Sequence, residues 1–516
     1  MVSGLHPLHW AEVEPDKTAW IFGDQRVSYA RLVQSALKGA QLLRKLGLKT
    51  GDGVAVVAEN HPNTLAFFWA AQMAGLYYTP ISVQFHPDEI GYILADCDAR
   101  LLMASRAQEE RVAGAPQPMR LTLDTWLDAI AGEPATLIAD ACEGAEMLYS
   151  SGTTGRPKGV RAASPGAPLG TVSELFRRRL ALHEVDGQAV YLSTAPLYHS
   201  APLRYNTMMH RCGATSVIMP RFDAAESLAL IETHRVTHSQ WVPTMFVRLL
   251  KLPAETREAF DLSSHRLAVH AAAPCPVPIK RQMLDWWGPI LHEYYSGTEG
   301  NGQTAITPEE WLAHPGSVGK PVLGNVHILD EAGNEAPIGT EGCVYFGDGA
   351  RFEYYKDPAK TAASYDERGW STLGDIGYLD QEGYLYLTDR ASHMIITGGV
   401  NVYPREVEDV LVTHPAVQDA AVFGIPDPEF GEQVKAAIEL VPGTTVNGDE
   451  LIAFCRARIA HLKCPKSVDF HDTLPRHQTG KLYKEALKRP YWPEPSANKE
   501  PSANKEPSAN KEPSAE

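Results

Sequence analysis

A run of hydroxyl side chains and glycines leads to a lysine between residues 147 and 160. Three apolar residues, Met147 to Tyr149, precede it and are typical of the end of a buried strand. Glycines let the backbone turn its N–H groups toward an anion, while hydroxyls and an ammonium add further donors. The stretch therefore predicts a cradle for phosphate oxygens. The residues expected to form it are Ser150, Ser151, Gly152, Thr153, Thr154, Gly155 and Lys158.

The spacing of this cradle differs from that of a Walker A loop. Pro157 stands where the second glycine of that motif would be, and Gly159 follows the lysine in place of a serine or threonine. A flexible surface loop rich in small residues is the alternative interpretation. The density of donors directly after a predicted strand argues against it.

Small residues and carboxylates recur further along the chain. His270 to Pro276 places small residues after a predicted strand, where a flat ring could lie against the backbone, although an ordinary strand-to-helix turn would look the same. Glu299 is a hard oxygen ligand of the kind that Mg²⁺ prefers beside phosphates, or else a solvated loop carboxylate. Asp375 could accept hydrogen bonds from both hydroxyls of a ribose. These are the parts that binding of ATP would need.

The elements around these stretches alternate between strands and helices. Residues 18–30 resemble a hairpin, and a helix follows it. A strand over 54–58, a helix over 63–74 and a strand over 77–81 form a βαβ unit, which implies a parallel sheet. The alternation resumes after the cradle and continues to a strand over 290–295, so the fold class is predicted to be doubly wound α/β.

Two other patterns follow the α/β part. Short strands with glycine-rich turns between 318 and 388 predict a β-barrel-like subdomain, and a smaller α+β unit begins at about 391. The predicted domains are a large N-terminal domain over 1–390 and a small C-terminal domain over 391–490. From Glu494 the chain repeats Glu-Pro-Ser-Ala-Asn-Lys without an apolar face, so we predict a disordered tail over 491–516.

Composition limits the function classes. The net charge of −16 argues against a protein that coats nucleic acid, although a local positive site could still hold an anion. The seven cysteines form no C-x-x-C pair and predict reduced thiols in a cytoplasmic protein. The N-terminus lacks a basic region followed by an apolar run, and no stretch of 18 uninterrupted apolar residues occurs, so neither a signal peptide nor a transmembrane segment is expected.

Ser150 to Gly159 resembles the phosphate loop of the adenylate-forming superfamily, which contains acyl-CoA synthetases, luciferases and the adenylation domains of peptide synthetases. Further motifs of that superfamily follow in order, and the resemblance spans about residues 10–488. Two motifs depart from the usual pattern, with Ser296 in place of a glycine and Leu373 in place of a threonine. The matching segments are 270–276, 293–300, 369–375, 397–404 and 475–481.

The resemblance implies a role for each motif. Lys481 would bridge the carboxylate and the α-phosphate, and Ser392 occupies the hinge position, where many relatives carry aspartate or lysine. Gly398 and Gly399 would let the pantetheine arm of CoA pass close to the backbone, although a tight turn before a capped helix also explains them. The nucleotide contacts would be Ala272, Ala273, Pro274, Tyr295 and Ser296 around the adenine, Thr298 at the α-phosphate, Glu299 at Mg²⁺, and Asp375 and Arg390 at the ribose.

The implied activity is an ATP-dependent, AMP-forming carboxylate–CoA ligation through an acyl-adenylate, with ATP, Mg²⁺ and CoA. The small domain would be mobile and would rotate on its hinge between the two half-reactions. Transfer of the acyl group to another acceptor is the alternative, either a carrier protein or a luciferase-like oxidation. No room for a folded carrier domain is expected after residue 490.

The small-molecule acid is expected to bind around residues 199–208 and 238–246. His199 matches a histidine or aromatic position at the mouth of the acyl pocket, although a lone histidine after a strand is often structural. Tyr205, Trp241, Phe246, Met208 and Met209 suggest a sizeable apolar cavity, and Arg204 would contact either a polar group or solvent. A medium- or long-chain fatty acid and a bulky ring-bearing acid, aromatic or steroid-derived, both fit. The sequence leaves a homodimer open.

Overall fold

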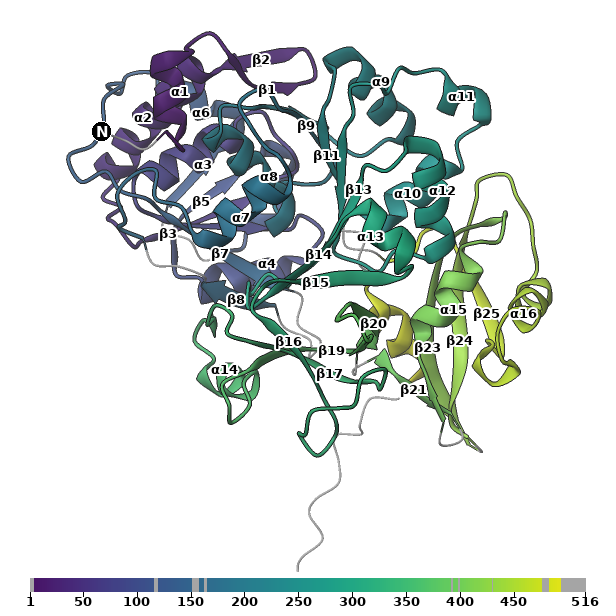
Figure 1. Cartoon of the computed structure of the whole chain (residues 1–516). Helices are drawn as coiled ribbons and strands as arrows, with labels where there is room; N and C mark the ends of the chain where they lie inside the picture. Colours follow the sequence, from purple (N-terminus) through teal and green to yellow (C-terminus); the bar gives the residue numbers. More distant parts are fainter. Residues whose placement is uncertain are drawn as a thin grey trace, which may run out of the picture.

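The computed structural model describes residues 4–115, 119–150, 157–161, 165–390, 393–397, 400–428, 430–475 and 482–492. The strands in these ranges form a thirteen-stranded, a seven-stranded and a five-stranded sheet, with helices packed against them (Figure 1). This mixed α/β architecture, with a large N-terminal part and a small C-terminal unit, confirms the predicted fold class. No helix of the described chain is long and apolar enough to cross a membrane.

The seven-stranded sheet has the order β18-β8-β7-β4-β3-β5-β6 and a parallel centre. The predicted βαβ unit is confirmed, since β3 pairs in parallel with β4 through α3. Val54 and Val56 of β3 pack into a core that includes α2 and α3, whereas Ala55 and Val57 pack into a core that includes α4. Helices therefore cover both faces. The bounds are β3 (Gly53–Val57), β4 (Tyr77–Ile81), β5 (Ala99–Ala104), β6 (Met119–Thr122), β7 (Ala145–Ser150), β8 (Lys158–Arg161), β18 (Glu353–Tyr354), α1 (Pro7–Val13), α2 (Tyr29–Lys45), α3 (Thr64–Met73), α4 (Pro87–Asp96), α5 (Glu109–Val112) and α6 (Trp126–Ala129).

The thirteen-stranded sheet changes character along its length. From β1 through β10, β9, β11 and β12 to β13 its pairs are parallel, and from β13 through β14, β15, β20, β19 and β17 to β16 they are antiparallel. The predicted barrel-like region is thus a run of antiparallel strands that continues the doubly wound sheet. The bounds are β1 (Thr18–Phe22), β2 (Gln25–Ser28), β9 (Val190–Ser193), β10 (Thr215–Ile218), β11 (His238–Trp241), β12 (Leu267–His270), β13 (Leu291–Tyr295), β14 (Gln303–Ile306), β15 (Ser317–Leu323), β16 (Asn325–Leu329), β17 (Gly342–Gly347), β19 (Ser371–Leu379) and β20 (Leu385–Arg390).

A buried ion pair holds a helix of this part against the sheet. The helices are α7 (Glu174–Leu182), α8 (Ser200–Arg211), α9 (Ala224–His234), α10 (Pro243–Leu250), α11 (Ala254–Glu258), α12 (Val277–Trp287), α13 (Pro308–Ala313) and α14 (Pro358–Ala363). Lys280 of α12 donates to Glu293 of β13 at 2.6 Å, and their side chains are 0% and 6% exposed. Burial, and then the charge of Lys280, keep the pKa of nearby His270 well below its ordinary value, so that ring is neutral. The pair fixes the strand end that leads to Tyr295.

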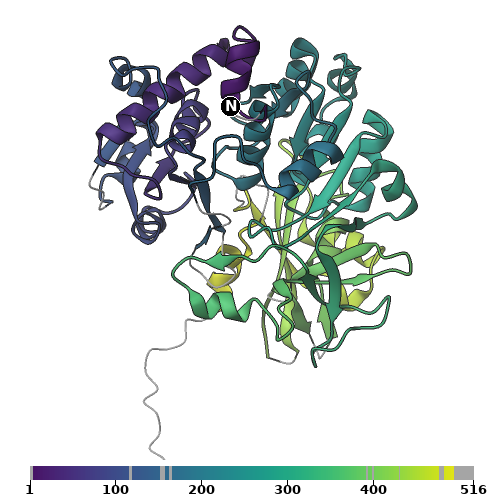
Figure 2. The ribbon, with the colours of Figure 1, turned by 60° about the vertical axis from the view of Figure 1, so that its left-hand side comes forward.

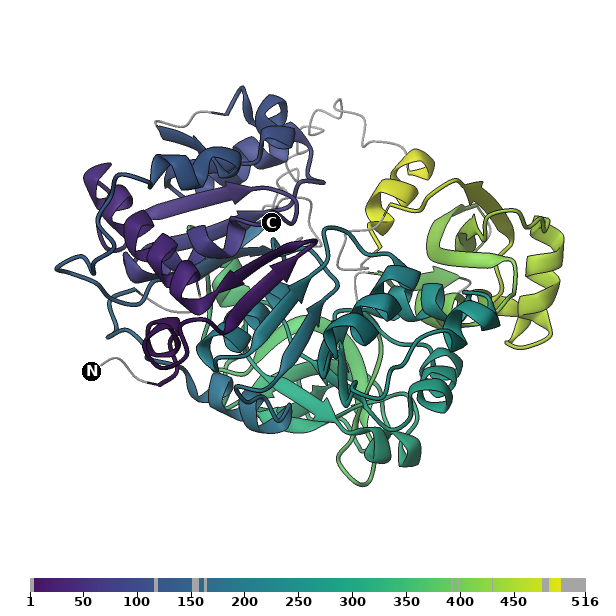
Figure 3. The same cartoon turned by 90° about the horizontal axis from the view of Figure 1, so that it is seen from above.

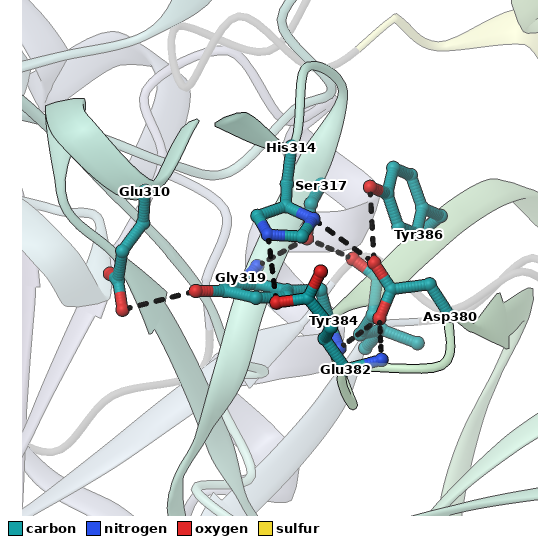
Figure 4. A network of polar contacts seen from close by, with 9 residues as sticks. Glu310, His314, Ser317, Gly319, Asp380, Glu382, Tyr384 and Tyr386 are labelled. Atoms are coloured by element: carbon teal, nitrogen blue, oxygen red, sulfur yellow. Dashed lines mark hydrogen bonds and ion pairs between the residues drawn. The ribbon is translucent and has the colours of Figure 1, made fainter. Parts of the chain in front are cut away.

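The β19–β20 hairpin is anchored by a polar network around its turn (Figure 4). The Asp380 carboxylate accepts from the backbone N–H groups of Glu382 and Tyr384, both at 2.9 Å, and contacts His314 Nδ1 at 3.1 Å. The Tyr384 ring stacks on His314, and its hydroxyl donates to Glu310 of α13 at 3.3 Å. Burial raises the pKa of Asp380, but these N–H groups and His314 outweigh it and leave the pKa below its ordinary value. The hairpin that carries Asp375 is therefore tied to α13.

The five-stranded sheet forms the small C-terminal unit, which lies beside the teal and green segments of the large part and away from the purple N-terminal segment (Figures 2 and 3). Val407 and Leu411 of α15 pack into its core. Its elements are β21 (Ile395–Thr397), β22 (Val400–Val402), α15 (Pro404–Leu411), β23 (Val417–Asp427), β24 (Gly431–Leu440), α16 (Gly448–Arg456), β25 (Ser467–His471) and α17 (Lys484–Lys488).

The packed chain continues two residues into the predicted tail. Tyr491 donates a hydrogen bond to Asp469, and the Trp492 indole donates to the Gly424 carbonyl at 3.1 Å. Tyr491 also packs against an apolar cluster that includes Phe423. The prediction that the tail begins at 491 is therefore wrong by these two residues, because Tyr491 packs on an apolar cluster and Trp492 hydrogen-bonds to β23. Residues 493–516 lie outside the described part.

Candidate active site

Two cavities meet at the carboxyl ends of the neighbouring parallel strands β12 and β13. The larger has a volume of about 490 Å³ and the smaller about 250 Å³, and both are lined by Ala272, Tyr294 and Ser296. Ligands of open α/β sheets bind at this edge of the strands. The larger cavity is also lined by Lys158, His199, Trp241, Thr298 and Glu299, and the smaller by Ala273, Pro274, Tyr295 and Asp375. The predicted site residues named here therefore gather in one region.

The smaller cavity offers a flat, small-residue wall beside an aromatic ring and a carboxylate. The Tyr295 hydroxyl donates to Asp375 Oδ2 at 2.6 Å. Ala272 has a φ of 73°, a left-handed conformation that costs free energy for a residue with a side chain and often marks a functional segment. This arrangement suits a base stacked near Tyr295 and a ribose at Asp375. Arg390 lies opposite Asp375 in the β19–β20 pair.

The small unit supplies the other wall of this cavity. Arg405, Glu408 and Lys484 line it from α15 and α17. The Lys484 ammonium pairs with Glu408 Oε1 at 2.8 Å, and the backbone N–H of Val422 donates to the same carboxylate at 2.6 Å. A nucleotide in the smaller cavity would therefore touch both the large part and the small unit.

Glu299 is held in the wall of the larger cavity. The residue is 8% exposed, and its Oε1 accepts a hydrogen bond from the Tyr354 hydroxyl at 2.9 Å. Gly297 packs directly against this carboxylate, because a Cβ there would lie 2.3 Å from Leu373 Cδ1 and 2.8 Å from Glu299 Oε2 and would displace both side chains. Ser296, which replaces the usual glycine, donates to the Gly302 carbonyl at 2.8 Å and closes the loop that carries the glutamate.

Two lysines lie together on the same wall. Lys158 of β8 and Lys360 of α14 both line the larger cavity, and the Lys158 ammonium lies 5.5 Å from the centre of the Tyr354 ring. Burial lowers the pKa of Lys158, and the ammonium of Lys360 lowers it further, while Asp357 and Glu299 act in the opposite direction. Two close ammonium groups facing a cavity are what binding of a polyphosphate would need.

Lys360 was missed by the sequence analysis because no local pattern marks it. It reaches Lys158 through tertiary structure, since β18 precedes α14 and pairs with β8 at Tyr354 and Val160. A two-residue strand such as β18 leaves almost no signal in the sequence. A lysine in a short exposed helix is usually a surface charge.

Several predicted residues lie outside the described part of the chain. Ser150 is described only by its backbone, which ends β7 and pairs with Lys158 of β8. The backbone on either side of the predicted cradle is therefore one antiparallel pair. The predicted residues that fall outside are Ser151, Gly152, Thr153, Thr154, Gly155, Ser392, Gly398, Gly399 and Lys481; for Arg390 only the backbone is described.

Aromatic and apolar residues form the remaining walls of the larger cavity. They include Trp241 and His199, both of which were predicted. The His199 ring lies edge-on to the Tyr198 ring, with the ring centres 4.6 Å apart. Tyr205 was expected here but lies behind the wall, with its hydroxyl 3.0 Å from His183 Nδ1 and its ring stacked on Tyr191. Met208, Met209 and Phe246 are buried in the core instead of lining the cavity.

Two arginines also reach this cavity. Arg204 pairs with Glu146, with Nε 2.7 Å from Oε2, so the structure assigns it an ion pair in addition to its place on the wall. Arg179, which the sequence analysis did not single out, lines the cavity from α7 and donates to the amide oxygen of Gln303. Arg179 is the last of three consecutive arginines on an amphipathic helix, so nothing in the sequence distinguishes it from its exposed neighbours.

The donor set fits Mg²⁺ held together with phosphate oxygens. Within the described ranges no group of three or more His, Cys, Asp or Glu could hold a metal by itself. Glu299 is a nearly buried carboxylate on the wall that carries Lys158 and Lys360. Mg²⁺ is commonly bound by one or two carboxylates with substrate phosphates and water, which matches such a wall.

Comparison with known proteins supports the interpretation of this region as a nucleotide-binding site. The AMP-binding enzyme family model matches residues 8–355, and the AMP-binding enzyme C-terminal domain model matches residues 406–481. A feruloyl-CoA synthase from Amycolatopsis sp is 34% identical over 493 residues, covering 94% of this chain and 98% of that protein. A 2-succinylbenzoate–CoA ligase from Bacillus licheniformis is 33% identical, covering 92% and 98%. ATP-bound MatB from Rhodopseudomonas palustris has a TM-score of 0.80 at 28% identity, covering 95% and 99%.

The chain therefore belongs to the AMP-binding enzyme family of adenylate-forming proteins. It lies in the acyl-CoA synthetase branch and is an AMP-forming acid–CoA ligase that uses ATP, Mg²⁺ and CoA. The resemblance inferred from the sequence motifs is thereby confirmed.

Proposed function

We propose that this chain joins a bulky, ring-bearing carboxylic acid to CoA. The observation that carries the proposal is the larger cavity, in which the aromatic walls at Trp241 and Tyr198 adjoin the wall of Lys158 and Glu299. An acid and a triphosphate can then meet in one enclosure. The relatives named for feruloyl-CoA and 2-succinylbenzoate support a ring-bearing acid. The part of the larger cavity that would contact the acid also carries polar side chains. A plain alkyl chain would bury them without hydrogen-bond partners, which argues against a fatty acid.

The proposed first half-reaction places the reacting groups in line. A carboxylate oxygen of the acid attacks the α-phosphorus, and the bond to the departing pyrophosphate breaks. Lys481 would hold the carboxylate and the α-phosphate together, with Thr298 as a further donor to that phosphate. Mg²⁺ held by Glu299 would neutralise phosphate charge. Asp375 and Arg390 would fix the ribose and so set the position of the α-phosphate.

The second half-reaction would need the small unit to move. We propose a boundary between domains over 1–390 and 391–490, with Ser392 at the hinge. Rotation would remove Lys481 from the site and bring Gly398 and Gly399 to the path of the pantetheine arm. The CoA sulfur then attacks the acyl carbonyl carbon, and AMP leaves. All seven cysteines are free thiols, which supports localisation in the reducing cytoplasm.

Pyrophosphate release over a panel of carboxylic acids tests the proposed function. We expect release with aromatic or polycyclic acids to exceed release with fatty acids of similar volume by about tenfold or more, because rings pack against the aromatic walls. Acyl-CoA should accumulate only when CoA is present. Equal or better turnover of fatty acids would contradict the ring preference. Turnover with a carrier protein or oxygen in place of CoA would contradict the acceptor.

Lys360→Gln is expected to raise KM for ATP by about tenfold and to change the KM for the acid little. The substitution removes one of two ammonium groups that would meet the phosphates, and a hydrogen bond to a charged group contributes about 1.5–3 kcal/mol when well formed. Steady-state kinetics with ATP as the varied substrate measure it. Lys356→Gln is the matched control, because Lys356 is exposed and pairs with Asp98 outside the cavity. An unchanged KM for ATP would remove Lys360 from the phosphate site.

A further inference from the structure

The guanidinium of Arg179 faces the larger cavity from α7. Its Nε and Nη2 donate to the amide oxygen of Gln303 at 3.0 and 2.8 Å, and its Cζ lies 5.7 Å from the centre of the Tyr294 ring. Gln303 is neutral, and the ion pairs found in the described part of the chain include none to Arg179. The interaction with Gln303 orients the guanidinium without neutralising its charge.

The surroundings of Arg179 carry an excess of positive charge. Its neighbour on the wall, Arg204, already pairs with Glu146 at 2.7 Å, so two guanidinium groups share one carboxylate. Burial lowers the pKa of Arg179 below its ordinary value and the charge of Arg204 adds to this, against smaller opposing effects of Tyr294, Tyr205 and Glu146. A guanidinium stays protonated even so. Holding two guanidinium groups beside one carboxylate, partly away from water, costs free energy, which an anion in the cavity would offset.

We propose that Arg179 binds a second carboxylate on the acid substrate, so that the enzyme acts on ring-bearing dicarboxylic acids. This inference rests on the proposed function and names the class of acid. The planar guanidinium, held in the orientation set by Gln303, retains free N–H groups that match a carboxylate. The reacting carboxylate would lie toward Lys158 and Glu299, and the second one toward Arg179, with the ring between the aromatic walls.

The test compares matched acids on the whole enzyme. Pyrophosphate release is measured with three ring-bearing acids of equal size, which carry at the far end of the ring a carboxylate, a ketone oxygen or a methyl group. We expect the wild-type kcat/KM to be at least tenfold higher for the dicarboxylic acid. In Arg179→Gln the kcat/KM for that acid should fall by about 10- to 100-fold, while the value for the methyl acid changes less than threefold.

Two further variants separate a specificity role from a structural one. Arg177→Gln changes an exposed arginine of the same helix and should leave the preference intact. Arg179→Lys keeps the charge and should keep part of the preference for the dicarboxylic acid. If Arg179→Gln lowers kcat/KM equally for all three acids, or lowers the thermal unfolding midpoint while the preference persists, the guanidinium only anchors α7 to β14.

The outcome also distinguishes this inference from the proposed function. If the wild-type enzyme turns over the methyl or keto acid as well as the dicarboxylic acid, the second-carboxylate inference is wrong and the ring-acid ligase stands. If no ring-bearing acid supports pyrophosphate release while fatty acids do, the proposed function itself is wrong.

Discussion

Lys481→Ala is expected to lower the rate of acyl-adenylate formation by about 10²- to 10³-fold and to spare thioester formation from supplied acyl-adenylate. The ammonium is expected to hold the carboxylate and the α-phosphate, two groups that repel each other. Leu482, the next residue in the chain, and Lys484 both line the smaller cavity. The attack of a thiol on the acyl carbonyl involves no such repulsion, and the half-reactions can therefore be separated.

Two single-turnover measurements test this expectation. One follows acyl-adenylate formation from ATP and acid, and the other follows acyl-CoA formation from purified acyl-adenylate and CoA. Lys466→Ala is the matched control, because Lys466 is an exposed lysine of the same unit that lines neither cavity. If both half-reactions of Lys481→Ala slow equally, the lysine does not have the assigned role.

Glu299→Gln is expected to lower the rate of acyl-adenylate formation by about 10²-fold or more and to raise the Mg²⁺ concentration needed for half-maximal rate. The amide oxygen can still accept the hydrogen bond from Tyr354, so the wall keeps its shape while it loses one negative charge. Lys158 and Lys360 would then still face the phosphates, but without the negative charge of Glu299 beside them.

A Mg²⁺ titration of pyrophosphate release measures this effect. Tyr354→Phe is the paired variant, because it removes the hydrogen bond to Glu299 and leaves the carboxylate charge in place. Its effect should be several times smaller. A Glu299→Gln enzyme with the wild-type Mg²⁺ dependence would show that the metal is held elsewhere.

Much of the fold and many positions of the site could be predicted because their signals are local. The strand, helix and strand over 53–81 are separate apolar runs of different length, and turn residues such as Gly75 close them. Ala272, Tyr295 and Glu299 belong to short segments at the ends of buried strands. Parallel strands bring such ends to one edge of a sheet, so the predicted residues meet there.

The remaining features depend on contacts between segments far apart in the chain. Lys360 meets Lys158 because a two-residue strand pairs with β8, and Arg179 meets Gln303 across α7 and β14. Periodicity marks a residue as buried but does not say which buried residues border a cavity. Tyr205 is the example, since it lies on the buried face of α8 yet contacts the core instead of the cavity.

The two-sided wall of the smaller cavity has a thermodynamic consequence. Tyr295 and Asp375 form one side, and Glu408 and Lys484 of the small unit form the other. A ligand that binds only when both sides are folded and in contact stabilises that folded, associated state, because binding shifts the equilibrium toward it. Melting of the two units should therefore become more cooperative as AMP is added, with a single sharper heat-absorption peak in calorimetry.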